Sequence, residues 1–204
     1  MTRLWRLCFL LTGALIMAGG PMHPNGTMAE MLADPDWIPS HALMTLGFAA
    51  LALGLVVYRR AVPLPSGSAR WAGIALLGAT LQTVEMVLHT AAAVDLENLV
   101  AGESTPILSA HLWLTNIAYP VFGATMIGFI VATARDRVLA SPWIAWLGIL
   151  GAAAHGAAGP LTVFFELGWA PILFPMVILL ALWLVAAAVW PLRAAATKPL
   201  AESA

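Results

Sequence analysis

Six long apolar stretches limit what this sequence can fold into. A helix that crosses a hydrocarbon layer of roughly 30 Å needs about 20 mainly apolar residues. Six stretches of the chain meet that requirement: Leu4–Gly20, Ile38–Tyr58, Trp71–Val94, Leu108–Ala134, Pro142–Phe165 and Trp169–Trp190. We therefore expect an all-α, polytopic integral membrane protein. It would be a six-helix transmembrane bundle with short loops, forming a single domain over residues 1–204.

The composition supports a chain whose main solvent is the lipid bilayer. Its residues are 61% apolar and 9% charged, whereas a soluble domain is about 45–50% apolar and about 25% charged. A soluble core cannot hide so much apolar surface, because roughly 30% of the unfolded surface stays exposed after folding. A nucleic-acid partner, a disordered chain and a secreted disulfide scaffold are thereby excluded. The single cysteine, Cys8, permits no intramolecular disulfide.

The charged residues predict the orientation of the bundle. With a cytoplasmic N-terminus, all nine basic residues fall on one side: Arg3, Arg6, Arg59, Arg60, Arg70, Arg135, Arg137, Arg193 and Lys198. Most of the acidic residues fall on the other side: Glu30, Asp34, Asp36, Asp95, Glu97, Glu103 and Glu166. Cytoplasmic loops carry the excess of lysine and arginine. We therefore predict a multi-pass protein of the cell inner membrane with both termini in the cytoplasm.

The N-terminal region contains a first apolar stretch preceded by arginines and, after it, a segment with helix-capping residues. Arg3 and Arg6 before a short apolar run are also typical of a secretory signal peptide. Because no A-x-A cleavage site follows, we favour a retained helix over residues 4–20. Further along, Thr27 and Glu30 have the spacing of a capping box and predict a short helix on the outer surface near residues 27–34.

Histidine and glutamate are the groups of greatest chemical interest. Four consecutive spans each carry one histidine in their outer half or near its edge: His41, His89, His111 and His155. A further histidine, His23, lies in the outer loop. Glu85 is the only carboxylate inside a span, and an ionisable side chain in hydrocarbon costs about 2.5–3.5 kcal/mol. Glu85 should therefore face the bundle interior, with His89 one turn along as its nearest partner.

These residues predict a metal-centred site in the outer half of the bundle. Imidazole is a ligand of haem iron and of copper and iron ions. Haem b is the first candidate cofactor and a copper or iron ion is the second. The predicted metal ligands are His41, His89, His111 and His155.

The neighbouring polar residues suggest roles within that site. His89 and His155 would be the deeper, cofactor-binding ligands. Glu85 is the candidate catalytic residue, which would orient His89 or relay protons from the outer aqueous phase. Gln82 shares a helix stripe with Glu85 and His89. Gln82 and Asn116 would supply hydrogen bonds to the ligands.

Residues of small volume surround His155. The run from Gly148 to Gly159 consists almost entirely of glycine and alanine. Such a face allows the close approach of a flat porphyrin or of another helix. Most of the methionines also lie toward the outer side, and thioether with imidazole suits Cu(I) and the axial positions of haem.

One histidine on each of four consecutive spans resembles cytochrome b561-type haem proteins. That resemblance implies two haems, held by His41 with His111 and by His89 with His155. The chain departs from the family because none of its histidines lies near the inner face, which leaves an inner haem without a ligand. Outer-side histidine and methionine are similarly reminiscent of the copper-resistance membrane proteins.

The predicted site is suited to electron transfer or to oxidation of a small or lipid-soluble partner. A quinol or another membrane redox protein would be such a partner. Three alternatives stay open. The first is a proton- or ion-coupled permease in which Glu85 and His89 titrate. The others are an intramembrane metal hydrolase with Glu85 as general base, and an accessory subunit of a larger membrane complex. A homo-oligomer is equally open.

Overall fold

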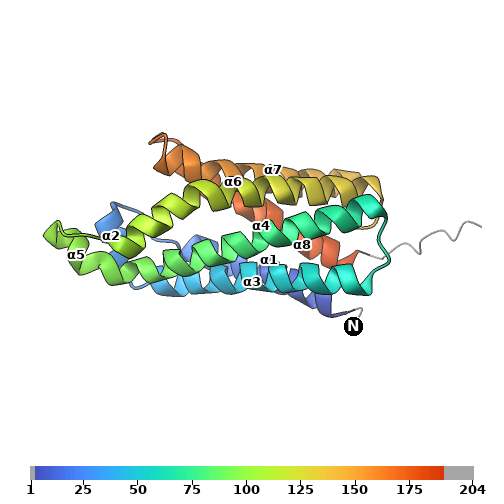
Figure 1. Ribbon diagram of the computed structural model, residues 1–204, viewed down its shortest axis with the longest axis horizontal. Helices are drawn as coiled ribbons and strands as arrows, with labels where there is room; N and C mark the ends of the chain where they lie inside the picture. Colours follow the sequence, from blue (N-terminus) through green and yellow to red (C-terminus); the bar gives the residue numbers. More distant parts are fainter. Residues whose placement is uncertain (1–2, 191–204) are drawn as a thin grey trace, which may run out of the picture.

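The computed structural model describes residues 3–190 and, within them, confirms an all-α bundle (Figure 1). Six helical segments are long and apolar enough to cross a membrane. The main helices of these segments are α1 (Leu4–Gly19), α3 (Trp37–Ala61), α4 (Ser66–Ala91), α6 (Pro106–Arg135), α7 (Pro142–Val163) and α8 (Val177–Val189).

The six helices form a closed ring in chain order. Each packs against the next, and α8 returns to pack against α1. On α1, the side chains of Trp5, Phe9 and Ile16 are fully buried in the core. Gly13 lies so close to α8 that an added Cβ would be 2.9 Å from the carbonyl oxygen of Ala181. The first helix is therefore an integral wall of the bundle, packed against α3 and α8.

Prolines explain where the last span departs from the prediction. Residues 170–176 form a 3₁₀ segment, η3 (Ala170–Met176), and α8 begins only at Val177. Pro171 is tolerated in a first turn, but Pro175 lacks the backbone N–H that an α-helix beginning at Trp169 would need at that position. The third span differs at its other end, because α4 continues into η2 (Ala92–Asp95) and the short α5 (Leu96–Ala101).

The small residues around His155 serve helix packing. A Cβ added to Gly123 of α6 would lie 2.6 Å from the carbonyl oxygen of Ala152 on α7. One residue earlier on α7, Gly151 packs directly on the backbone of α8 at Leu180. Neighbouring helices therefore occupy the faces of the run at Ala152 and Gly151, which agrees with the second of the two interpretations, the close approach of another helix.

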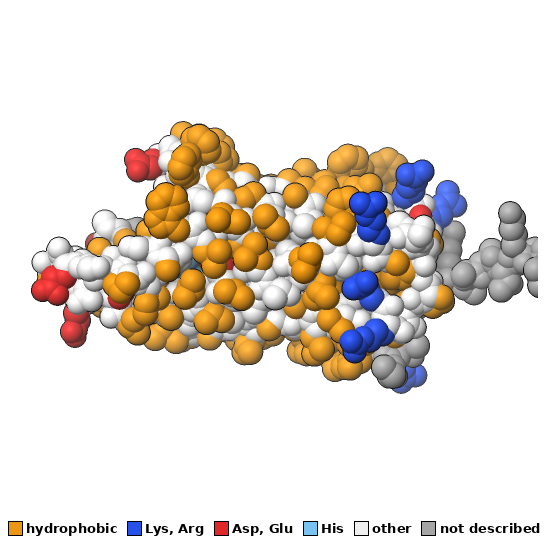
Figure 2. All heavy atoms as spheres, in the orientation of Figure 1, with side chains coloured by type: hydrophobic (Ala, Val, Ile, Leu, Met, Phe, Trp, Pro, Cys, Tyr) orange, Lys and Arg blue, Asp and Glu red, His pale blue; other side chains and the backbone are white. Residues whose placement is uncertain are grey.

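Charge is divided between the two ends of the bundle. Figure 2 shows the arginines gathered at one end and most of the carboxylates at the other. Asp136 lies at the basic end, where it accepts a hydrogen bond of 2.6 Å from the Ser68 hydroxyl. Arg193, Lys198 and Glu202 lie outside the described residues. The positive-inside rule predicts that the basic end faces the cytoplasm, and we call the opposite end the outer end.

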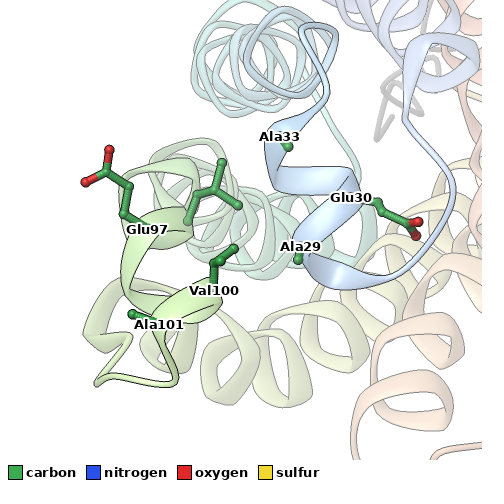
Figure 3. A pocket seen from close by; sticks show the side chains of 7 residues that line it. Ala29, Glu30, Ala33, Glu97, Val100 and Ala101 are labelled. Carbon is green, nitrogen blue, oxygen red and sulfur yellow. The ribbon is translucent and has the colours of Figure 1, made fainter.

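Short helices cover the outer end. The predicted surface helix is present as α2 (Met28–Ala33), and its capping box is confirmed. The Thr27 backbone N–H and the Thr27 hydroxyl both donate to Glu30 Oε2 at 2.8 Å. These two hydrogen bonds lower the pKa of the Glu30 carboxyl. An open groove lies between α2 and α5, with Ala29 and Ala33 on one side and Val100 on the other (Figure 3). None of the histidines lines this groove.

A buried aspartate fixes the start of α6. Asp95 Oδ2 accepts the backbone N–H groups of Ile107 and Leu108, at 2.7 and 2.8 Å. The residue just before the helix, Thr105, makes no capping bond with its side chain. Asp95, which precedes Ile107 by 12 residues, therefore accepts hydrogen bonds from the N–H groups of the first turn of α6. A carboxylate at the N-terminus of a helix is also favoured by the helix dipole.

We predict that Asp95→Ala destabilises the bundle by about 1–3 kcal/mol, because two buried N–H groups lose their acceptor. Thermal unfolding in detergent should show a clearly lowered midpoint. Glu97→Ala is the matched control, since Glu97 is exposed two residues away and its removal should leave the midpoint unchanged. Equal midpoints for the two variants would contradict the capping role.

Candidate metal centre

Four imidazoles and one carboxylate meet at the outer end of the bundle. We call this group the histidine cluster: His23, His41, Glu85, His89 and His111. The rings form a row in which neighbouring centroids lie 4.8 Å apart for His23 and His41, 4.1 Å for His41 and His89, and 3.9 Å for His89 and His111. Such a row concentrates nitrogen donors that can bind a transition metal.

The chain topology explains why these residues meet. His41 lies near the start of α3, His89 near the end of α4 and His111 near the start of α6. Because α3, α4 and α6 run alternately up and down and pack in sequence, these three positions fall at the same end. His23 joins them from the segment between η1 (Gly20–Met22) and α2.

Glu85 is the fully buried centre of a hydrogen-bond network. Its Oε1 lies 2.8 Å from Nδ1 of His111 and accepts a 2.8 Å hydrogen bond from the Thr115 hydroxyl. Its Oε2 accepts a 3.0 Å hydrogen bond from Nε2 of Gln82. The network ties α4 to α6 and satisfies a carboxylate that would otherwise be very unfavourable in this apolar environment.

The closest partner of Glu85 differs from the one expected. Sequence spacing suggested His89, but its Nδ1 lies 3.7 Å from Glu85 Oε1, which is too long for a hydrogen bond. His111 from the neighbouring helix takes that place. The reason is that two side chains on packed helices can lie closer together than two side chains one turn apart on the same helix. Nδ1 of His89 is left buried without a hydrogen-bond partner.

Two histidines are held with one nitrogen free. Nδ1 of His41 lies 2.6 Å from the carbonyl oxygen of Trp37, and Nδ1 of His23 lies 2.7 Å from that of Pro24. A carbonyl only accepts hydrogen bonds, so Nδ1 carries the proton and Nε2 keeps its lone pair. Metal-binding histidines are characteristically oriented in this way. Nε2 of His41 is buried and has no partner.

The sequence places His23 in the outer loop and predicts no ligand role for it. Burial lowers the pKa of its imidazole from the usual range, which favours the neutral form that binds metals. Its ring lies beside both His41 and Trp37. Its position just outside the first span, on the same side as His41 and His111, was the signal available in the sequence.

The donor atoms fall into two groups of metal-binding geometry. His23, His41 and His89 offer nitrogens that all lie within 4.8 Å of one another. Glu85, His89 and His111 form a second such group. Imidazole nitrogen and carboxylate oxygen are ligands of zinc, copper and iron. The cluster therefore has the chemistry and the spacing for a metal ion.

His155 lies away from the cluster. Its ring stacks on Tyr119 with centroids 4.4 Å apart, and Phe48 and Phe122 lie on its other sides. Both of its ring nitrogens are buried without a hydrogen-bond partner. Asn116 likewise makes its hydrogen bond elsewhere, to the Leu112 carbonyl oxygen of its own helix at 3.0 Å.

The haem pairings implied by the resemblance do not fit the described residues. His41 and His111 would form one pair, yet the His89 ring contacts both of them. His89 and His155 would form the other, yet His155 is surrounded by aromatic rings. A porphyrin needs an open slot between two facing imidazoles, and rings 3.9–4.1 Å apart leave none.

No protein-family model, curated protein or solved structure matches this chain. The fold and the cluster alone define its class: a polytopic helical membrane protein with a buried group of histidine and glutamate side chains that could bind a metal.

We predict that Glu85→Ala lowers the stability of the metal-free protein by about 2–4 kcal/mol, because the buried donors around the carboxylate lose their acceptor. Thermal unfolding in detergent measures the effect. Val84→Ala on the same helix, with Val84 half exposed, is the control and should change the midpoint little. A similar loss in both variants would show that Glu85 does not organise the interface of α4 and α6.

Proposed function

We propose that this protein is a membrane metalloprotein that binds copper or iron at the histidine cluster and uses the metal for electron transfer or oxidation of a small or lipid-soluble partner. One observation carries the proposal. Four imidazoles and a carboxylate lie together, and two of the imidazoles present a free Nε2 while their Nδ1 is fixed by a backbone carbonyl.

The donor set favours a transition metal. Calcium and magnesium prefer oxygen ligands, whereas this cluster is dominated by imidazole nitrogen. Its geometry favours a bare ion over haem, since the imidazoles contact one another. When bound, copper or iron would supply one-electron redox chemistry. The protein residues would hold the ion, with Glu85 balancing part of its charge and fixing the His111 ring.

The position of the cluster suits a partner that arrives from the membrane or from the outer aqueous phase. His41 is fully buried, whereas the His89 side chain is 12% exposed. The Trp37 ring packs on both, with centroids 4.2 and 5.1 Å away. A quinol is a partner of suitable chemistry, because it is lipid-soluble and releases two electrons and two protons on oxidation to the quinone.

Metal analysis provides the first test. Detergent-purified protein should be stripped with chelator, incubated separately with Cu(II), Fe(II) or Zn(II), desalted and analysed by mass spectrometry. Copper or iron should be retained in stoichiometric amount by the wild type and by His155→Ala, whose ring lies outside the cluster. His89→Ala should lose it, because His89 belongs to both donor groups. Wild-type protein that retains no metal would disprove the proposal.

Quinol oxidation provides the second test. Copper- or iron-loaded protein should oxidise duroquinol with ferricyanide as the final acceptor, each quinol reducing two ferricyanide ions and releasing two protons. The rate above background should fall at least tenfold in His41→Ala and remain in His155→Ala, as followed by ferricyanide absorbance. Activity at background level in fully metal-loaded protein would contradict the redox role while leaving metal binding intact.

A further inference from the structure

We propose that the histidine cluster holds two metal ions and that His89 bridges them through its two ring nitrogens. This inference rests on the proposed function and specifies the site. The loop subsite consists of His23, His41 and His89. The carboxylate subsite consists of Glu85, His89 and His111.

Distances between the donors argue against a single ion bound by all five residues. Two ligands of one ion can be no further apart than twice the metal–nitrogen bond, about 4.2 Å. The described donors do not form one group of five within even 4.8 Å. They form two groups of three that share only His89. Each group needs only a small closure to surround an ion, whereas gathering all five would require rearranging the row.

The position of His89 within the row suits a bridge. Its ring lies between those of His41 and His111, at centroid distances of 4.1 and 3.9 Å. Its Nδ1 is on the side of Glu85, 3.7 Å from Oε1, and is buried with no hydrogen-bond partner. An imidazole whose Nδ1 donates to a backbone carbonyl could not bridge, because that nitrogen is occupied. His89 makes no such bond, unlike His41 and His23.

The two subsites differ in charge. The loop subsite offers neutral imidazoles, whereas the carboxylate subsite adds the charge of Glu85 and the nearby hydroxyl of Thr115. When both nitrogens of His89 bind metal, its ring proton leaves to solvent, and the resulting imidazolate reduces the repulsion between the two cations. Two adjacent one-electron centres would together accept both electrons of a quinol.

The test is a copper titration of the stripped, detergent-solubilised full chain. The wild type and His155→Ala should each bind two Cu(II) ions per chain. His23→Ala removes a ligand of the loop subsite alone, and His111→Ala removes one of the carboxylate subsite alone, so each should retain one ion. Circular dichroism checks that the variants are folded. If His111→Ala unfolds, His111→Gln replaces it, since glutamine can still donate to Glu85.

Electron paramagnetic resonance reports on the bridge. In the wild type, two Cu(II) ions joined by an imidazolate couple magnetically, so the signal should account for less than half of the bound copper. In His23→Ala the remaining isolated ion should be fully visible. Full signal from two bound ions would overturn the bridge, and one ion in the wild type would overturn the pair while leaving the proposed function in place. No bound ion would overturn both.

Discussion

The outer end of the bundle depends on one buried carboxylate. Glu85 has no access to solvent, and an uncompensated polar or charged group in such an environment would be very unfavourable. Its hydrogen-bond partners come from two helices: Gln82 on α4, and Thr115 and His111 on α6. The requirement to satisfy Glu85 therefore fixes the register of α4 against α6 and the orientation of the His111 ring.

A second constraint holds the other side of the cluster. Trp37 begins α3, and its carbonyl oxygen accepts from His41 one turn later while its indole ring packs on His41 and His89. Asp95 fixes the start of α6 from the segment that follows α4. The histidines are thus carried by helix ends that are themselves anchored, which is the rigidity that a metal site requires.

The fold follows from the sequence because lipid imposes a simple rule. Apolar stretches of spanning length must be helices. Successive spans must cross in opposite directions, so α3, α4 and α6 alternate in direction. Alternation alone brings His41, His89 and His111 to one end. The sequence could not supply the lateral placement of each helix, so it did not separate His155 from the cluster or show that His111, not His89, bonds Glu85. The contribution of His23 depends on the path of a loop, which no periodic pattern encodes.

The depth of the cluster limits what it can do. Every histidine of the chain lies toward the outer end, while the core nearer the basic end is closed by Trp5, Tyr58, Phe129 and Trp183. Within residues 3–190, no histidine lies near the basic end, so the described residues form no second histidine site there. In the proposed function, the electron donor and acceptor would therefore reach the metal most directly from the outer end of the bundle, where the His89 side chain is 12% exposed. This one-sided access favours chemistry on an external or lipid-soluble partner over electron transfer across the membrane.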